Sequence, residues 1–415
     1  MRILYLHQHY STPAGALPGR SHAFAAALAA RGHAVTLVCG RHEGAKIGTD
    51  ASFRRGVRSA EVAGFRVVQH DIPYAQAMDV RARGRAFLAY AAAATRQAVR
   101  GRWDLVIASS TPLTVALPMI AAKRLGGART LFEVRDRWPE LPAAMGMASR
   151  PAIAAMARLE RAALAAADAV VALAPGVAEA LGAACGDPTR VAFIPNGCDR
   201  ALFADVAPER PVPAPEGGIL AVYAGAHGRA NGLGQLLDVA WVLKSWRERR
   251  VRLVLIGEGA ERPALIARAT SEGLDNVTFL EPMPRARLAA VLKGADVALH
   301  CLAPVPAFAE GTSPNKVFEA LAAGLPVLTN CPGWLGRELE RAEAGAAFPP
   351  GQPAPFAEAL AALATAPERR AAMAAAAARL AAGRFDRSLL AERFCAVAEA
   401  AAQRAPLPAA PPLPA

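Results

Sequence analysis

The chain has 415 residues, of which 53% are hydrophobic and 20% are charged. This balance excludes an intrinsically disordered protein, and the length exceeds what a single hydrophobic core usually holds, which predicts two domains. The formal net charge of +12 is compatible with nucleic acid or an anionic membrane as a partner. Aromatic residues make up only 6% and do not interleave with basic runs, so we predict no nucleic-acid partner.

The chain carries no sequence signal for insertion into a membrane or for export. No apolar run reaches the roughly 20 residues that a membrane span needs, and the opening MRILYLHQHY reads as a buried strand rather than a signal peptide. The six cysteines include no CxxC pair, which favours reduced thiols over a disulfide framework or a zinc site. We therefore predict a cytoplasmic protein.

Short apolar segments alternate with alanine-rich helical segments, which predicts βα units around a parallel sheet. In the first half, strands are predicted at residues 2–6, 34–38, 65–68, 105–108, 130–134, 169–173 and 191–194. Helices are predicted at residues 21–31, 86–99, 113–125, 153–166 and 174–184. The loop after the first strand, residues 7–24, contains Gly15 and Arg20 and is long for a βα connection.

The predicted helix at residues 86–99 lies in a strongly basic segment. Six arginines flank it or lie in it, and no acidic residue occurs from position 80 to position 103: Arg81, Arg83, Arg85, Arg96, Arg100 and Arg102. A basic helix with an apolar face suits an interfacial position on anionic lipid. A solvated surface helix explains the same pattern, and both interpretations stay open.

Charged residues follow the strand predicted at 130–134, in the segment EVRDRWPELP. Charges at the end of a buried strand must be paired or belong to a site. Strand C-termini line the ligand cleft in parallel α/β folds, so Arg135, Asp136 and Glu140 are candidate site residues. A surface ion-pair cluster is the alternative.

A proline-rich segment at residues 204–218 predicts a linker between a first domain, 1–203, and a second domain, 219–384. Strands are predicted there at 219–223, 253–256, 277–280, 297–299 and 327–329, and helices at 233–248, 262–271 and 285–292. A closing helix is predicted at 389–403 within a segment 385–404, and the Pro/Ala tail from 405 to 415 is predicted to be disordered.

Several turns of the second half have the chemistry of a nucleotide-sugar site. Residues 223–232, YAGAHGRANG, and residues 253–265 place glycines (Gly225, Gly257) directly after strands, where backbone amides can approach a diphosphate. Residues 308–330, FAEGTSPNKVFEALAAGLPVLTN, form a loop that opens a helix, whose N-terminus favours phosphate. Glu319, about one turn further on, can accept hydrogen bonds from a ribose diol.

These motifs, together with the turn IPNGCD at residues 194–199, resemble the family 4 glycosyltransferases, which are retaining enzymes with two Rossmann-like domains. Glu319 matches the second of two family glutamates, but the first falls on Gly311. The family arginine and lysine of the glycine-rich loop fall on Ala226 and Asn231, so Lys316 or Arg229 would have to supply the positive charge. The segment Arg-Asp-x-Trp-Pro-Glu resembles a subgroup that adds N-acetyl-fucosamine-type sugars during surface-polysaccharide assembly.

The resemblance implies a GT-B fold, with two doubly wound domains facing a cleft and a C-terminal helix that crosses back to the first domain. It implies transfer from a nucleotide-diphospho-sugar, such as a UDP-N-acetylated sugar, to a polyprenyl-diphosphate-linked or saccharide acceptor at the inner membrane surface. A UDP-sugar 2-epimerase-like isomerase of the same fold is the alternative. No Asp-x-Asp pair or ligand cluster occurs, so metal-independent catalysis without a cofactor is predicted.

The predicted site residues fall into three groups. Predicted catalytic residues are Asp136, Arg135 and Lys316. Predicted donor-binding residues are Gly15, Gly225, Arg229, Gly257, Gly311, Thr312, Ser313, Asn315, Lys316 and Glu319, and predicted acceptor-side residues are Arg20 and Glu140.

Overall fold

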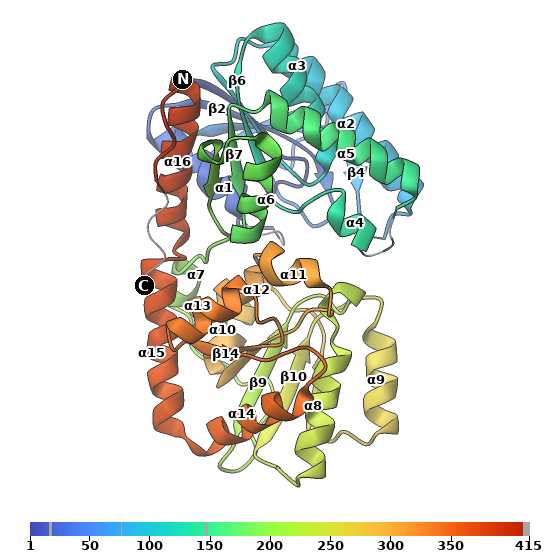
Figure 1. Ribbon diagram of the computed structural model, residues 1–415, viewed down its shortest axis with the longest axis vertical. Helices are drawn as coiled ribbons and strands as arrows, with labels where there is room; N and C mark the ends of the chain where they lie inside the picture. The colour runs from blue at the N-terminus through green and yellow to red at the C-terminus, as the bar shows by residue number, and fades with distance from the viewer. Residues whose placement is uncertain (16–18, 76, 145, 147, 410–415) are drawn as a thin grey trace. The chain divides into compact units, whose positions relative to one another are not determined.

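The computed structural model describes residues 1–15, 19–75, 77–144, 146 and 148–409. Its internal contacts divide the chain into two compact units (Figure 1). Unit 1 comprises Met1–Pro195 and Ser388–Ala415, and unit 2 comprises Asn196–Arg387. Each unit is an α/β fold built around a mainly parallel sheet, so the predicted pair of doubly wound domains is confirmed.

Unit 1 contains an eight-stranded sheet among its described residues, in the order β3-β4-β2-β1-β5-β6-β7-β8. The strands are β1 (Arg2–Leu6), β2 (Ala34–His42), β3 (Val57–Val62), β4 (Phe65–Tyr74), β5 (Leu105–Ser109), β6 (Arg129–Val134), β7 (Ala169–Ala172) and β8 (Val191–Phe193). The helices are α1 (Arg20–Ala30), α2 (Val80–Arg100), η1 (Leu113–Val115), α3 (Ala116–Gly126), α4 (Glu140–Ala144), α5 (Arg150–Ala166), α6 (Pro175–Cys185), η2 (Pro188–Arg190) and α16 (Arg387–Gln403).

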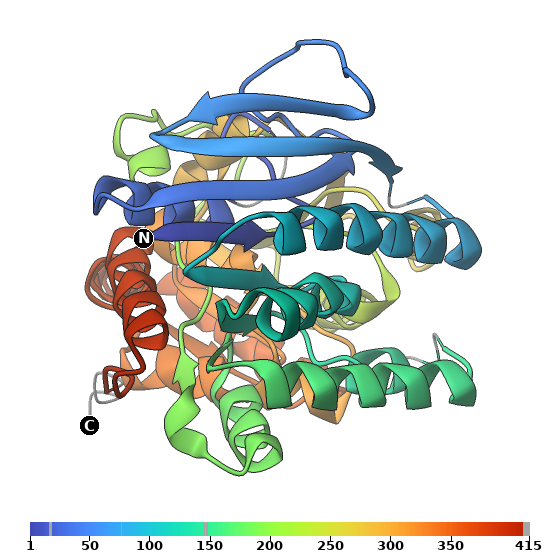
Figure 2. The same ribbon diagram turned by 90° about the horizontal axis from the view of Figure 1, so that it is seen from above.

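Helices cover both faces of this sheet, which is why its central strands, such as β1 and β5, are continuous apolar runs. Helices α2, α3 and α5 lie side by side on one face (Figure 2). On the other face, α1 and α16 share one core with the strands. The rings of Phe24 and Phe394 stack there with centroids 4.3 Å apart, and Tyr5 lies 6.1 Å from Phe394. The closing helix therefore belongs to the core of unit 1.

Unit 2 contains a parallel six-stranded sheet among its described residues, in the order β11-β10-β9-β12-β13-β14. The strands are β9 (Ile219–Ala224), β10 (Val251–Ile256), β11 (Val277–Leu280), β12 (Val297–His300), β13 (Val327–Thr329) and β14 (Gly345–Ala347). The helices are α7 (Ala201–Ala204), η3 (Arg229–Asn231), α8 (Gly234–Ser245), α9 (Arg262–Ser271), α10 (Arg285–Gly294), α11 (Pro306–Gly311), α12 (Asn315–Ala322), α13 (Trp334–Arg341), α14 (Pro353–Thr365) and α15 (Pro367–Gly383).

The strand order of each sheet contains a switch point. In unit 2 the chain builds outward from β9 through β10 to β11, and then returns to place β12 on the other side of β9. Unit 1 does the same around β1 and β5. Loops diverge at the C-terminal ends of such neighbouring strands and leave room for a ligand. The loop after β1 lies at the switch point of unit 1, and the loops after β9 and β12 lie at that of unit 2, whereas residues 194–199 follow the edge strand β8.

The structure differs from the predicted elements in several places. Strands β3 and β14 were not predicted. Gly311 ends helix α11 and does not belong to a loop, so the connection to α12 is confined to residues 312–314. The division between the units falls after Pro195, where the sequence placed it after residue 203. Cys198 belongs to unit 2 because its backbone amide bonds the carbonyl of Phe385, at 2.8 Å.

The predicted linker is fixed to unit 2. The Glu209 amide donates to the Ala290 carbonyl at 2.9 Å, and the Glu209 carboxylate pairs with Arg287 at 2.9 Å. The start of the predicted disordered tail also packs. Ala405 donates to the Ala400 carbonyl at 2.9 Å and Leu407 contacts the unit 1 core. Residues 410–415 lie outside the described residues.

Among the described residues, no helix is both long and apolar enough to cross a bilayer.

Candidate functional site

Two glycine turns are stacked at the C-terminal ends of β9 and β10. A Cβ on Gly257, whose φ is 142°, would lie 2.0 Å from the Gly225 carbonyl oxygen. A Cβ on Gly259 would lie 2.4 Å from the carbonyl oxygen of His227, and the His227 amide donates to the Glu258 carbonyl at 2.7 Å. Close backbone packing accounts for Gly257, whereas a Cβ on Gly225 would lie 3.1 Å from Lys316 Nζ and 3.2 Å from the Tyr223 hydroxyl.

Lys316, in the first turn of α12, points toward the β9 turn. Its ammonium donates to the Tyr223 hydroxyl at 2.8 Å and to Asn231 Oδ1 at 2.6 Å, and Nζ lies 4.5 Å from the centre of the Tyr223 ring. Tyr223 in turn donates to the Ala226 carbonyl at 2.9 Å. No carboxylate of the described chain lies within ion-pair distance of Lys316. Its charge is held by neutral groups and is not cancelled by a counter-ion.

The surroundings of Lys316 disfavour its charged form. Burial lowers the pKa of Lys316 from 10.5 to about 8, because few water molecules reach the ammonium. An anion bound beside it would restore the ordinary pKa. Lys316 also contacts Asn231, the position at which the family would carry a lysine. The ammonium of Lys316 therefore lies beside the loop position where family 4 glycosyltransferases usually carry a lysine and this chain carries Asn231.

Two buried polar atoms near Lys316 have no hydrogen-bond partner among the described residues. These are Nε2 of His300 and Oδ1 of Asn315. His300 Nδ1 bonds Thr329 Oγ1 at 2.8 Å. Burial lowers the pKa of His227 and of His300, and the charge of Lys316 adds to the effect, so both rings are neutral at pH 7. Because buried polar atoms are nearly always bonded, this cluster is suited to a polar ligand or ordered water.

Glu319 is already paired in the structure. Its carboxylate accepts from Arg285, at the start of α10, at 3.2 Å, and the two side chains are 21% and 20% exposed. A hydroxyl of a ligand can still reach the remaining lone pairs, since a carboxylate offers about four acceptor positions. Arg285 was missed by the sequence analysis because 34 residues separate it from Glu319.

The other predicted donor residues are only partly free for a ligand. Thr312 Oγ1 donates to the Phe308 carbonyl at 2.8 Å. Ser313 Oγ accepts from the Asn196 amide at 2.9 Å, and its carbonyl accepts from the Asn196 side chain at 2.7 Å. Both hydroxyls are therefore already hydrogen-bonded within the protein. The backbone of residues 312–314, which leads into the N-terminus of α12, is the part of this segment that a phosphate could contact. Arg229 is exposed at the start of η3.

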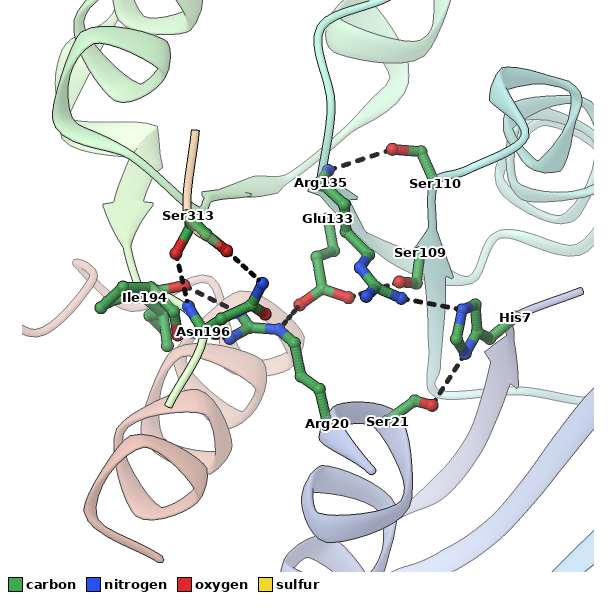
Figure 3. A network of polar contacts seen from close by, with 11 residues as sticks. His7, Arg20, Ser21, Ser109, Ser110, Glu133, Arg135, Ile194, Asn196 and Ser313 are labelled. Carbon is green, nitrogen blue, oxygen red and sulfur yellow. Dashed lines mark hydrogen bonds and ion pairs between the residues drawn. The ribbon is translucent and has the colours of Figure 1, made fainter. Parts of the chain in front are cut away.

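In unit 1, a buried ion pair lies at the ends of β5 and β6 (Figure 3). Arg20 donates to Glu133 at 2.8 Å, and both side chains are 1% exposed. Arg20 also donates to the carbonyls of Ile194 and Pro195, and Ser109 donates to the second oxygen of Glu133. Arg20 is therefore committed to holding the chain where it leaves unit 1. This position does not fit the predicted contact with an acceptor.

The remaining candidates of unit 1 lie just beyond β6. Arg135 donates to His7 Nε2 at 3.0 Å, and its amide donates to Ser110 Oγ at 3.1 Å (Figure 3). Asp136 is exposed. Glu140 is exposed and pairs with Arg137 at 2.6 Å, as the surface ion-pair alternative predicted.

Gly15 lies elsewhere in unit 1, in the loop before α1. A Cβ there would lie 2.0 Å from Ser11 Oγ, so packing within its own loop already requires the glycine.

The sequence analysis selected neither His300 nor His7, because a lone histidine is more often a core or loop residue than a ligand. Both are polar residues at the end of a buried apolar strand, β12 and β1 respectively. A polar residue at the end of an apolar strand is the same pattern by which the segment after β6 was selected. Applied to every predicted strand, this pattern would have selected both histidines.

Comparison with known proteins agrees with this geometry. Residues 19–197 match the model described as Glycosyl transferase 4-like domain, and residues 208–380 match Glycosyl transferases group 1. A D-inositol 3-phosphate glycosyltransferase of Kribbella flavida is 32% identical over 195 residues, 44% of this chain and 45% of that protein. The chain thus spans under half the length of this curated relative.

Solved structures show the same fold. The sucrose-phosphate synthase of Thermosynechococcus elongatus superposes with a TM-score of 0.72 at 18% identity, covering 95% of this chain and 97% of that one. HepE of Anabaena in complex with UDP superposes with a TM-score of 0.64 at 18% identity, covering 95% and 98%. The chain has the GT-B fold of these structures; its first half matches a glycosyl transferase 4-like model, and its second half matches a model of glycosyl transferases group 1.

Proposed function

We propose that this glycosyltransferase moves a sugar, with retention of anomeric configuration, from a UDP-sugar to a lipid-linked or saccharide acceptor in surface-polysaccharide synthesis. The observation that carries the donor assignment is the ammonium of Lys316. It has no counter-ion among the described residues, and it lies beside neutral acceptors and unpartnered buried polar atoms. A site of this kind gains most from a ligand that brings negative charge and hydroxyl groups.

In this proposal, Lys316 binds the diphosphate and stabilises the charge that develops on UDP as the glycosidic bond breaks. The backbone of residues 312–314 and the start of α12 assist it. Glu319 accepts hydrogen bonds from the ribose diol while Arg285 holds its carboxylate. Asp136 and Arg135 act on the acceptor side, and no side chain is assigned as nucleophile. Catalysis without a metal stays a prediction, tested by full activity in excess EDTA.

The donor is tested by thermal stabilisation with a panel of nucleotides and nucleotide sugars, with UDP-N-acetylglucosamine among them. A bound ligand raises the melting temperature by mass action, so UDP and one UDP-sugar should stabilise the protein. Raised melting temperatures with GDP- or ADP-sugars alone would contradict the proposal. Incubation with UDP-N-acetylglucosamine and no acceptor tests the isomerase alternative, because an epimerised product would then form. NMR of the transferred sugar reports the anomeric outcome.

The membrane side of the proposal rests on helix α2. Arg81, Arg85, Leu88 and Arg96 are all exposed at helical spacing, and α2 contains no acidic residue. Val80 is 75% exposed and Leu88 is 60% exposed. Exposed leucine and valine among arginines suit the boundary between lipid headgroups and acyl chains. We place the acceptor, a polyprenyl-diphosphate-linked sugar, at the inner face of such a membrane.

Sedimentation with anionic liposomes tests this surface. Each basic residue near an anionic membrane contributes about 1 kcal/mol, so replacing Arg81 and Arg85 by alanine should weaken binding about 30-fold. The matched control replaces Arg247 and Arg249, two exposed arginines of unit 2, and removes the same charge elsewhere. Equal loss in both double variants would show a non-specific charge effect, and no binding at low salt would refute the membrane proposal.

A further inference from the structure

Of two arginines near the C-terminal end of β6, one forms an ion pair with a carboxylate and the other does not. Arg20 is buried and neutralised by Glu133, at 2.8 Å. Arg135 lies two residues after Glu133 along the chain and is partly exposed. Its guanidinium donates to an imidazole, His7 Nε2, at 3.0 Å. No carboxylate of the described residues pairs with Arg135, and the nearby Glu133 is already occupied by Arg20 and Ser109.

The hydrogen bonds determine the state of this imidazole. Because the guanidinium of Arg135 can only donate, His7 Nε2 must accept, and the ring proton lies on Nδ1. Nδ1 then donates to Ser21 Oγ, 2.7 Å away at the start of α1. His7 is only 3% exposed. The ring is therefore a neutral spacer, with Ser21 on one side and Arg135 on the other (Figure 3).

The charges around His7 keep it neutral. Burial lowers its pKa well below 6.5, and the cation of Arg135 lowers it further, as do His9, His42 and Arg20. A neutral imidazole orients the guanidinium without cancelling its charge, whereas a carboxylate in the same place would do both. The arrangement leaves a fixed cation that has no ion-pair partner among the described residues, beside the switch point of the unit 1 sheet.

We propose that Arg135 binds a phosphate group of the acceptor, and that His7 is the residue that positions it. The chemical class of the ligand is a diphosphate ester, because a planar guanidinium with free N–H groups matches two phosphate oxygens at once. This inference rests on the proposed lipid-diphosphate acceptor, and it gives Arg135 a role apart from Lys316, which serves the donor diphosphate in unit 2.

The test is calorimetric titration with geranyl diphosphate, a soluble short-chain analogue, while saturating UDP occupies the donor site. Arg135→Gln should weaken binding at least about tenfold, which corresponds to about 1.4 kcal/mol. The positioning role is tested with a matched pair. His7→Gln places an amide near the position of Nε2 and should keep most of the affinity. His7→Asn reaches only the position of Nδ1 and should lose it.

The controls separate this inference from the donor proposal. Each variant should keep the thermal stabilisation by UDP, which shows that it is folded and that its donor site is intact. Pyrophosphate binding that depends on Arg135 supports a phosphate site, and tighter binding of geranyl diphosphate supports the lipid-linked source. If UDP stabilises all variants but Arg135→Gln binds geranyl diphosphate as tightly as the wild type, the inference is wrong. If UDP binds none of them, the donor proposal has failed instead.

Discussion

Replacing Lys316 by methionine removes a charge and keeps most of the side-chain volume. The lost ammonium donates to Tyr223 at 2.8 Å and to Asn231 at 2.6 Å. Both partners are neutral, so the variant leaves no unpaired charge in the protein. In the proposed complex the ammonium also donates to the UDP diphosphate, and a hydrogen bond to a charged group contributes about 1.5–3 kcal/mol. The variant should therefore bind UDP about 10- to 150-fold more weakly. Without ligand it should be at least as stable as the wild type, since a poorly hydrated cation without a counter-ion is gone.

The pH dependence gives a second measure of the same residue. Burial holds the pKa of Lys316 at about 8, and bound diphosphate favours the protonated form, so UDP affinity should fall as pH rises through about 8. The protonated fraction falls about tenfold between pH 7 and pH 9, and wild-type affinity should fall by the same factor. Burial raises the pKa of Cys301 to about 12, so this neighbour does not ionise in that range.

The assay is titration calorimetry with UDP at half-unit steps from pH 7 to pH 9, on the wild type and Lys316→Met. We expect a falling wild-type curve and a flat, weaker curve for the variant. Without ligand, the effect of pH is opposite, and the free energy of unfolding increases as the pH rises. Because the folded pKa of Lys316 lies below 10.5, the unfolded chain binds more protons between about pH 8 and 10.5, and stability should rise across that window. A variant that binds UDP as the wild type does, with the same pH profile, would remove Lys316 from the donor site.

Three further predictions test the packing and the pairs. Gly257→Ala should lower the melting temperature and the affinity for UDP, because its Cβ would lie 2.0 Å from a backbone oxygen. The control is Gly228→Ala, where a Cβ meets nothing within 4 Å. This variant should keep the melting temperature of the wild type. Glu133→Gln leaves buried Arg20 without its counter-ion and should cost about 3–5 kcal/mol in urea unfolding, and a loss below about 1 kcal/mol would contradict this role. Glu319→Gln should raise the donor KM more than it lowers kcat, and an unchanged KM would exclude a ribose contact.

Most strands could be predicted because their signal is local. A strand buried on both faces of a parallel sheet needs a short apolar run, and nearly every such run became a strand. β3 gave no such signal, because its sequence VRSAEV is an antiparallel edge strand with alternating partly exposed and exposed positions. β14 is only three small residues, GAA. Its strand conformation comes from pairing with β13, which is a tertiary effect.

The residues of the candidate site also divide into those that local sequence predicts and those that depend on tertiary contacts. Glycine turns and the start of a helix are local features, so Gly225, Gly257 and Lys316 could be selected from the sequence. Contacts between distant segments depend on the order of strands in the sheet. The bond between His7 and Arg135 joins residues 128 positions apart, and no periodicity or spacing indicates it.

The way α16 completes unit 1 has a consequence for how the protein is made. Leu390, Phe394 and Val397 are buried in the core that also contains Tyr5 and Phe24, yet the ribosome makes them only after all of unit 2. Domains usually fold in the order of their synthesis. Here, unit 2 is one continuous segment, Asn196–Arg387, and it can finish folding while unit 1 still exposes the apolar groove that α16 will fill. The half of the protein that is made first is therefore the last to be completed.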